Sequence, residues 1–185
     1  MAARFQPAAG KVPVCVPPLN PSPWLFTVLL LASTTALDGS QAGRPSAKPT
    51  HVLFLCPHGA AKSVLASAYF ERAAKERGLN VRVVSGGTEP DPAVSPAVAA
   101  HLKKNGYPVS SAAPRKLTHD QLANADIVVS LGCDLSAYPK PPGRLERWDE
   151  VPGPGENFAA ADEAIKKRVT QLIEELARAS ATKKK

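Results

Sequence analysis

The sequence is short of the residues from which metal centres and disulfide frameworks are built. Three cysteines occur in 185 residues, with no Cys-x-x-Cys pair and no cysteine–histidine spacing typical of zinc. Aromatic residues make up only 5% and do not alternate with basic ones, which argues against nucleic-acid binding. No apolar run reaches the roughly 20 residues that a membrane-spanning helix needs. We therefore expect no metal, no cofactor, no nucleic-acid partner and no integral membrane span.

The charge balance favours anionic partners. The chain has 23 Lys and Arg against 16 Asp and Glu, a formal net charge of +7. Part of this surplus lies in the closing residues 181–185, which end in three lysines and are expected to form a solvated basic tail.

The first fifty residues differ from the rest in composition. Residues 1–23 are rich in proline, and an apolar run follows at Trp24–Ala32. This arrangement is typical of a secretory signal. We expect a signal or leader over residues 1–42, a linker over 43–50, and an exported, periplasmic protein. The alternative is a start codon assigned too far upstream, which leaves the protein cytoplasmic.

From residue 51 onward, short apolar runs alternate with helical patterns. Strands are predicted at Val52–Leu55, Val81–Val84, Asp126–Leu131 and Arg144–Trp148. Helices are predicted over 63–77, from 96 to 106, briefly after 118, and over 160–179. Strands separated by helices indicate an α/β domain over residues 51–180. We expect a three-layer αβα sandwich with a four-stranded parallel sheet and ligands at the carboxyl ends of the strands.

Local signals refine these helices. The stripe expected to face the core in the first helix consists of Val64, Ala68, Tyr69 and Ala73. Gly78 is expected to close that helix in the left-handed conformation. Ser95 should cap the second helix ahead of a proline. Thr118 and Gln121 have the spacing of a capping box, which opens the third helix.

The loop from Cys56 to Ser63 leads from the first strand directly into the first helix. The unpaired backbone N–H groups there, together with the helix dipole, form an anion site. The same field should lower the pKa of the Cys56 thiol below its free value of about 8.5. A thiolate aimed at a bound phosphate or arsenate is a nucleophile. The residues expected to bind the oxyanion are Pro57, His58, Gly59, Ala60, Ala61, Lys62 and Ser63.

Two other interpretations of this loop remain. Cys56 is a small hydrophobic residue, of a type that is often simply buried at a strand end. Gly59–Ser63 is also similar to the end of a nucleotide-binding loop, although the glycines which that motif requires are missing.

Several motifs occur in the same order as in one known family. Cys56 is followed after five residues by Lys62 and Ser63, and further matches lie at 85–88, 114–118 and 125–129. Together they resemble the low-molecular-weight protein tyrosine phosphatases and the thioredoxin-linked arsenate reductases. The resemblance runs from residue 51 to about 179 and implies the low-molecular-weight phosphatase type of fold. It also implies Cys56 as nucleophile, Lys62 as oxyanion clamp and Ser63 as a donor to the sulfur.

Two positions depart from the family pattern. Lys62 replaces the family's arginine, so the two-pronged guanidinium contact with the anion is lost. The Asp-Pro pair that supplies the family's general acid aligns with Gly153, and the candidate replacements are Asp149, Glu150 and Glu156. Loss of a general acid typically costs about 10²–10⁴ in rate.

A second cysteine bears on the type of reaction. Cys133 follows the third strand, and its position resembles that of the resolving cysteine of the arsenate reductases, but no further cysteine occurs in residues 134–142. Three hypotheses follow. The first is a phosphomonoester hydrolase of the tyrosine phosphatase type that acts on phosphorylated proteins. The second is an arsenate reductase-like oxidoreductase that also uses Cys133 and a thiol reductant. The third is a weak or inactive member that only binds an oxyanion or a phosphopeptide.

Overall fold

The computed structural model describes residues 48–109 and 112–182. The predicted leader at 1–42, most of the linker and the last three residues of the basic tail lie outside the described residues, so the expected export stays a prediction. Within the described residues, no helix combines the length and the apolar character needed to cross a membrane.

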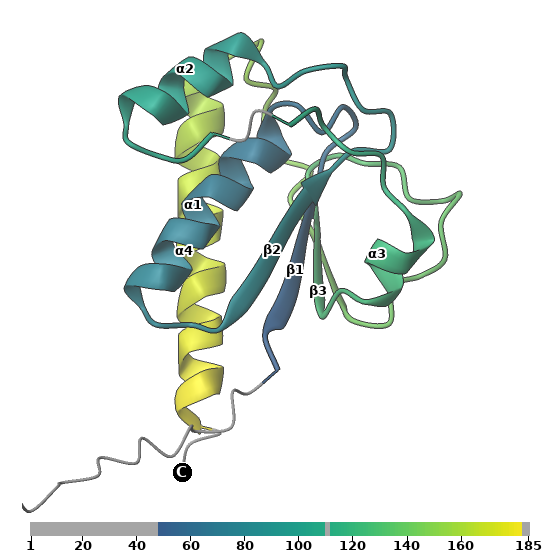
Figure 1. Cartoon of the computed structure of the whole chain (residues 1–185), viewed down its shortest axis with the longest axis vertical. Helices are drawn as coiled ribbons and strands as arrows, with labels where there is room; N and C mark the ends of the chain where they lie inside the picture. The colour runs from purple at the N-terminus through teal and green to yellow at the C-terminus, as the bar shows by residue number, and fades with distance from the viewer. Residues whose placement is uncertain (1–47, 110–111, 183–185) are drawn as a thin grey trace, which may run out of the picture. The chain divides into compact units, whose positions relative to one another are not determined.

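The centre of the domain is a four-stranded sheet in the order β2-β1-β3-β4, with every pair of neighbouring strands parallel (Figure 1). The strands are β1 (Thr50–Leu55), β2 (Val81–Gly86), β3 (Ile127–Ser130) and β4 (Arg144–Arg147). The continuous apolar runs of β1 and β3 are buried, as expected for inner strands covered on both faces. The predicted four-stranded parallel sheet is therefore confirmed, with β2 two residues longer and β3 two residues shorter than predicted.

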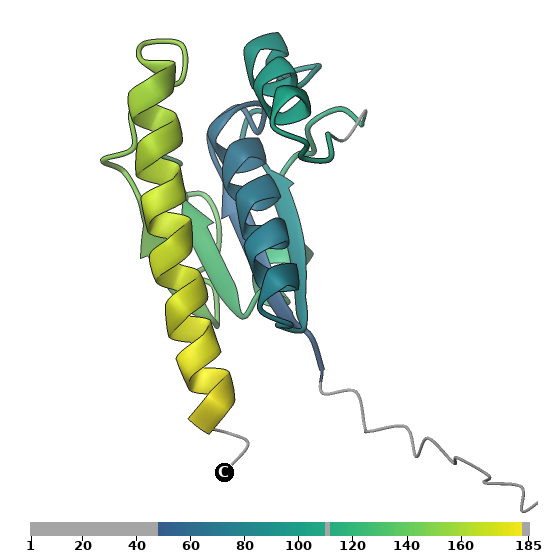
Figure 2. The same ribbon diagram turned by 90° about the vertical axis from the view of Figure 1, so that its left-hand side faces the viewer.

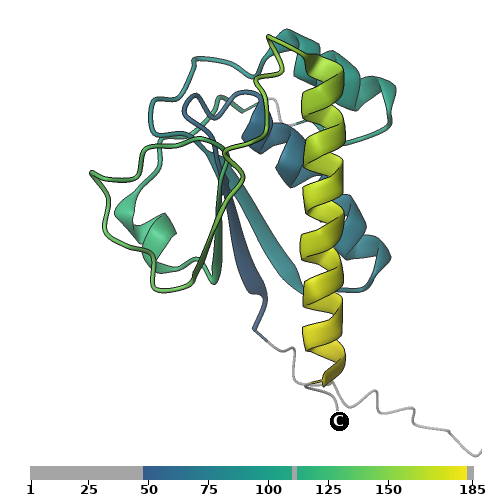
Figure 3. The same cartoon turned by 180° about the vertical axis from the view of Figure 1, so that it is seen from behind.

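Helices cover both faces of the sheet. On one face, α1 (Lys62–Glu76) and the long α4 (Phe158–Thr182) run side by side (Figure 2), and α2 (Pro96–Lys104) packs against α1. On the other face lies the short α3 (His119–Ala123), which Figure 3 shows on the opposite side of the sheet from α4. The three-layer arrangement predicted from the sequence is confirmed.

Each face of the sheet has its own apolar core. On the α1 side, Phe54 packs against Phe70 and Trp148, with ring centroids 5.4 and 5.9 Å apart. On the α3 side, leucines of β1 pack with Leu122 of α3 and with Cys133. Because β1 contributes to both cores, its carboxyl end is held firmly in place, and Cys56 follows it directly.

The stripe predicted to face the core in α1 is right for Ala68 and Tyr69 and wrong for its other two members. The buried face of α1 centres on Leu65, Ala66, Tyr69 and Phe70. Val64 and Ala73, which were expected on that face, lie at its margin because α1 is enclosed by both the sheet and α4. Ser95 is the N-cap residue of α2 with Pro96 at the first helical position, as predicted, although its side chain makes no capping hydrogen bond.

The other helix signals are correct. The Thr118 side chain accepts a hydrogen bond from the Gln121 backbone, and the Gln121 side chain accepts one from the Thr118 backbone, which completes the capping box. Gly78 has a φ of +62°, the left-handed conformation predicted at the end of α1.

Candidate active site

Cys56 lies at the carboxyl edge of the sheet, between the end of β1 and the loop that enters α1. Its side chain is 3% exposed, and its Sγ atom lies 3.2 Å from the Ser63 Oγ atom in the first turn of α1. The Cys56 amide donates to the Gly86 carbonyl at the end of β2. The sulfur is therefore held at a helix N-terminus, where the helix dipole favours negative charge.

The loop begins with a tight turn. The Gly59 amide donates to the Cys56 carbonyl at 3.2 Å, with Pro57 and His58 as the two central residues. Proline suits the first of these positions because its φ is already restricted to the required value. Gly59 has a φ of +61°, which residues with a side chain adopt at a steric cost.

The segment after β2 braces the outside of this loop. The carbonyls of Pro57, His58 and Ala60 accept hydrogen bonds of 2.9, 3.0 and 2.9 Å from the backbone amides of residues 89, 91 and 95. A carbonyl and the following N–H point in opposite directions across a planar peptide. The brace therefore turns the N–H groups of His58 and Ala61 away from itself.

Most amides of the loop and of the first turn are left without an internal partner. Within the described residues, no acceptor is found for the backbone N–H groups of His58, Ala60, Ala61, Lys62, Ser63 and Val64. Unpaired amides at a helix N-terminus are the groups that bind phosphate and related anions in other proteins. The geometry is thus compatible with the oxyanion loop expected from the sequence.

Close glycine packing holds the loop against the end of β2. A Cβ atom added to Gly87 would lie 2.6 Å from the Gly59 nitrogen and 2.7 Å from the Pro57 oxygen. On its other side Gly87 pairs with a later segment, since its amide donates to the Arg115 carbonyl and its carbonyl accepts from the Leu117 amide. Two motifs seen in the sequence, at 85–88 and 114–118, are therefore neighbours that together support the loop.

The Lys62 side chain connects the loop to two other strand ends. Its Nζ atom donates to the Val151 carbonyl, 3.3 Å away in the segment after β4. It also lies beside Gly132 after β3, where an added Cβ would come within 3.4 Å of Nζ. One of the three ammonium protons is engaged by Val151, and the remaining two are available to an anion.

Cys133 is the second buried free cysteine in the described part of the chain. Burial, and to a smaller extent the charge of Cys56, raise the pKa of its thiol to about 12, while the Ser130 hydroxyl and the Lys62 ammonium partly oppose the rise. Because the charges of Cys56 and Lys62 both act on the Cys133 thiol, the three side chains lie near one another. At neutral pH, Cys133 is accordingly a protonated thiol.

The three carboxylates proposed as replacement acids differ in their surroundings. Asp149 is half-exposed, lies 3.8 Å from Arg147, and its charge reaches Cys133. Glu150 accepts a hydrogen bond of 2.6 Å from Arg168 of α4. Burial would raise the pKa of Glu150, but its hydrogen bonds lower it below the ordinary value. Glu156 is exposed at the start of the segment that leads into α4. Asp149 is the one whose charge acts on a thiol of the candidate site.

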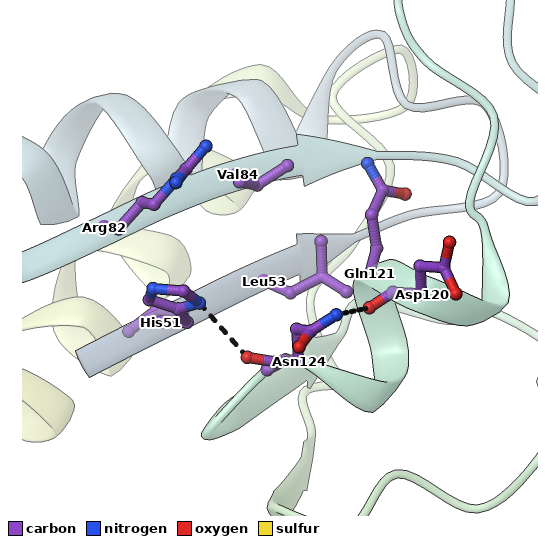
Figure 4. Close-up of a pocket in the computed structure, with 9 residues that line it drawn as sticks. His51, Leu53, Arg82, Val84, Asp120, Gln121 and Asn124 are labelled. Atoms are coloured by element: carbon purple, nitrogen blue, oxygen red, sulfur yellow. Dashed lines mark hydrogen bonds between the residues drawn. The ribbon is translucent and has the colours of Figure 1, made fainter. Parts of the chain in front are cut away.

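A cavity of about 300 Å³ lies elsewhere, at the start of β1 and β2 (Figure 4). Its lining includes Leu53 and Val84 as floor, with His51, Arg82 and Gln121 at its edges. The His51 ring is linked there to the Asn124 carbonyl at 3.2 Å. None of the predicted site residues lines this cavity. Within residues 48–109 and 112–182, no three His, Cys, Asp or Glu side chains form a group able to hold a metal ion.

Known proteins with similar sequences and structures include both phosphatases and arsenate reductases. Residues 51–137 match the family model described as low molecular weight phosphotyrosine protein phosphatase. A putative arsenate reductase of Halobacterium salinarum is 28% identical over 127 residues, which cover 66% of this chain and 89% of that protein.

Solved structures extend this result. A thioredoxin-dependent arsenate reductase of Corynebacterium glutamicum aligns with a TM-score of 0.62 and 29% identity. That alignment covers 72% of this chain but 65% of the relative, so this chain spans slightly less than two thirds of it. The low molecular weight protein tyrosine phosphatase of T. tengcongensis aligns with a TM-score of 0.59 and 24% identity, over 68% of this chain and 99% of that chain. This last likeness shows the fold alone.

The sheet order, the flanking helices and the cysteine loop define the low-molecular-weight phosphatase type of α/β domain. Residues 51–137 match the low molecular weight phosphotyrosine phosphatase family, and the chain is similar in sequence to arsenate reductases that share this fold. Proteins of this family bind phosphate or arsenate oxyanions.

Proposed function

We propose that the protein is a phosphomonoester hydrolase that uses Cys56 as its nucleophile. The proposal rests on one observation: the Cys56 sulfur lies 3.2 Å from the Ser63 hydroxyl, at the N-terminus of α1, beside backbone amides without an acceptor in the described residues. A nucleophile, a donor that stabilises its anion and a cradle for a tetrahedral anion are the parts such a reaction needs.

The reaction proceeds in two steps. The Cys56 thiolate attacks phosphorus, a P–S bond forms, the P–O bond to the leaving group breaks, and the electron pair moves to the leaving oxygen. Water then attacks the phosphocysteine, which releases phosphate and regenerates the thiolate. The loop amides and the Lys62 ammonium stabilise the charge on the non-bridging oxygens in both steps.

Lysine in place of arginine limits this activity. An ammonium supplies charge but not a planar pair of donors, and Lys62 already shares one proton with Val151. We expect turnover to be slow compared with an arginine-containing member and to be fastest for esters with good leaving groups.

Arsenate reduction is the second candidate, and the position of Cys133 favours it. In that reaction Cys56 first displaces an oxygen of arsenate. The Cys133 thiolate then attacks the Cys56 sulfur, a disulfide forms, and the As–S electron pair moves to arsenic, which leaves as arsenite. A dithiol reductant of the thioredoxin class would reduce the disulfide. The raised pKa of Cys133 opposes this step in the resting state, because the attacking species is the thiolate.

Two assays on the full chain separate the candidates. Hydrolysis of p-nitrophenyl phosphate should be lost in Cys56→Ser and retained in Cys133→Ala if the protein is a phosphatase. Dithiol-dependent release of arsenite should require both cysteines if it is an arsenate reductase. Vanadate binding without turnover in either assay would contradict both activities and leave an oxyanion or phosphopeptide binder.

A further inference from the structure

His58 is the loop residue whose side chain the oxyanion cradle does not use. It is the second central residue of the turn that follows Cys56, and its side chain is 63% exposed. The amide cradle needs only the backbone of His58, and the packed core does not include its ring. An exposed imidazole two residues from the nucleophile is therefore available for chemistry.

Asp91 holds this imidazole from the bracing segment. The His58 Nδ1 atom lies 3.4 Å from the Asp91 Oδ1 atom, and the Asp91 amide donates to the His58 carbonyl at 3.0 Å. The carboxylate thus engages one ring nitrogen and leaves Nε2 without a partner in the described residues. A carboxylate beside one nitrogen favours the tautomer and the ring orientation in which the other nitrogen exchanges protons with a substrate.

The candidate site needs a general acid that can protonate the leaving oxygen. The leaving oxygen of a phosphomonoester departs as an alkoxide or phenoxide unless an acid protonates it. Glu150 is held by Arg168 with its pKa lowered, and Gly153 has no side chain to offer. Asp149 lies 3.8 Å from Arg147, which competes for its carboxylate, and Glu156 is exposed in the segment that leads into α4. Imidazole exchanges protons near neutral pH, as the acid and base of one catalytic cycle must.

We propose that His58 is the general acid of this site and that Asp91 is its positioning residue, an inference that rests on the proposed phosphatase function. When the P–O bond breaks, the electron pair moves to the leaving oxygen and the Nε2 proton of His58 follows it, which releases an alcohol. In the second step the neutral imidazole takes a proton from the attacking water, so that phosphate leaves and the acid is restored.

Leaving-group dependence tests the proposal. Values of kcat/KM are measured for p-nitrophenyl phosphate, a good leaving group, and for phenyl phosphate, a poor one. His58→Gln should lower the value for phenyl phosphate by about 10²-fold or more, and the value for p-nitrophenyl phosphate by less than about tenfold. Asp91→Asn should also lower kcat/KM more for phenyl phosphate than for p-nitrophenyl phosphate, but by smaller factors than His58→Gln does.

Matched controls separate this role from a structural one. His119→Gln alters an exposed histidine that contacts Tyr138 on the α3 side, and it should leave both values unchanged. Equal losses on the two substrates, or a His58→Gln enzyme identical to His119→Gln, would overturn the role of His58 while the phosphatase function stands. A wild-type chain that hydrolyses neither ester overturns the phosphatase function, and this proposal with it.

Discussion

Replacing Gly87 with alanine tests whether the loop geometry depends on the end of β2. The added Cβ would lie 2.6 Å from the Gly59 nitrogen, 2.7 Å from the Pro57 oxygen and 2.9 Å from the His58 carbonyl carbon. Ordinary contact begins at 3.4 Å, so the loop and β2 must separate by about 0.8 Å. All three neighbours are backbone atoms, and therefore no rotamer change relieves the overlap.

The expected effect is large on activity and moderate on stability. Overpacking of this kind costs about 1–3 kcal/mol of folding free energy. A displacement of reacting groups by about 1 Å costs on the order of 10² in rate. We expect Gly87→Ala to lower kcat for p-nitrophenyl phosphate by about 10²-fold and to weaken vanadate binding, with a folded protein remaining.

Gly155→Ala is the matched control, because a Cβ at that position meets nothing within 4 Å. The assay compares kcat, vanadate affinity and Tm for the two variants and the wild type. If Gly87→Ala retains wild-type kcat and vanadate affinity, the loop does not depend on this contact and the account of how it is held is refuted.

Three further predictions concern other parts of the domain. Lys62→Arg should raise phosphatase turnover, by about 10²-fold if the guanidinium adds one oriented donor to the transition state; unchanged or lower turnover would mean that lysine serves a different chemistry. Burial raises the pKa of Cys133 to about 12 and also that of Tyr69, which is further raised by its hydrogen bond to Asp162. The contribution of these two protonated groups to stability is fully present below their pKa values in the unfolded state and is lost as pH rises toward their pKa values in the folded state. The free energy of unfolding measured by urea denaturation should therefore fall above about pH 9, and less steeply in Cys133→Ala. Burial would raise the pKa of Asp162, but hydrogen bonds from Lys166 and Tyr69 lower it, so its contribution is present at neutral pH and is lost as pH falls below about 4. Asp162→Asn should cost about 2 kcal/mol and lower Tm by roughly 7 °C at neutral pH, and a Tm that still falls on acidification as in the wild type would contradict this account.

The sequence predicts the domain well where one physical signal dominates. The apolar run of β1 indicates a strand buried on both faces, and the structure confirms it. Thr118 and Gln121 specify a capping box through local hydrogen bonds alone, and Gly78 specifies a left-handed helix end. The capping box and the helix end depend on interactions within a few residues, and the apolar run of β1 is itself a local pattern, so the sequence indicates all three directly.

Contacts between distant segments are harder to predict. The Lys62 ammonium reaches a carbonyl 89 residues away, and a backbone carbonyl has no sequence signature. Ser95 is predicted correctly as the N-cap of α2, but the sequence does not indicate that its amide donates to the Ala60 carbonyl and braces the loop. Gly59 and Gly87 are the sequence signal that could have predicted how the loop packs against the end of β2, since glycine often marks a close approach of two backbones.

The brace on the loop also bears on how such a site changes through time. Three backbone carbonyls of the loop are fixed from outside. In the function proposed above, affinity for a tetrahedral anion therefore resides in the main chain, which every amino acid shares. An exposed loop side chain such as that of His58 can then diverge without abolishing ligand recognition, whereas Gly59 cannot, because its φ is +61° and it packs against Gly87. A scaffold of this kind retains its ligand while exchanging its reaction, which explains how phosphate ester cleavage and arsenate reduction occur on one architecture.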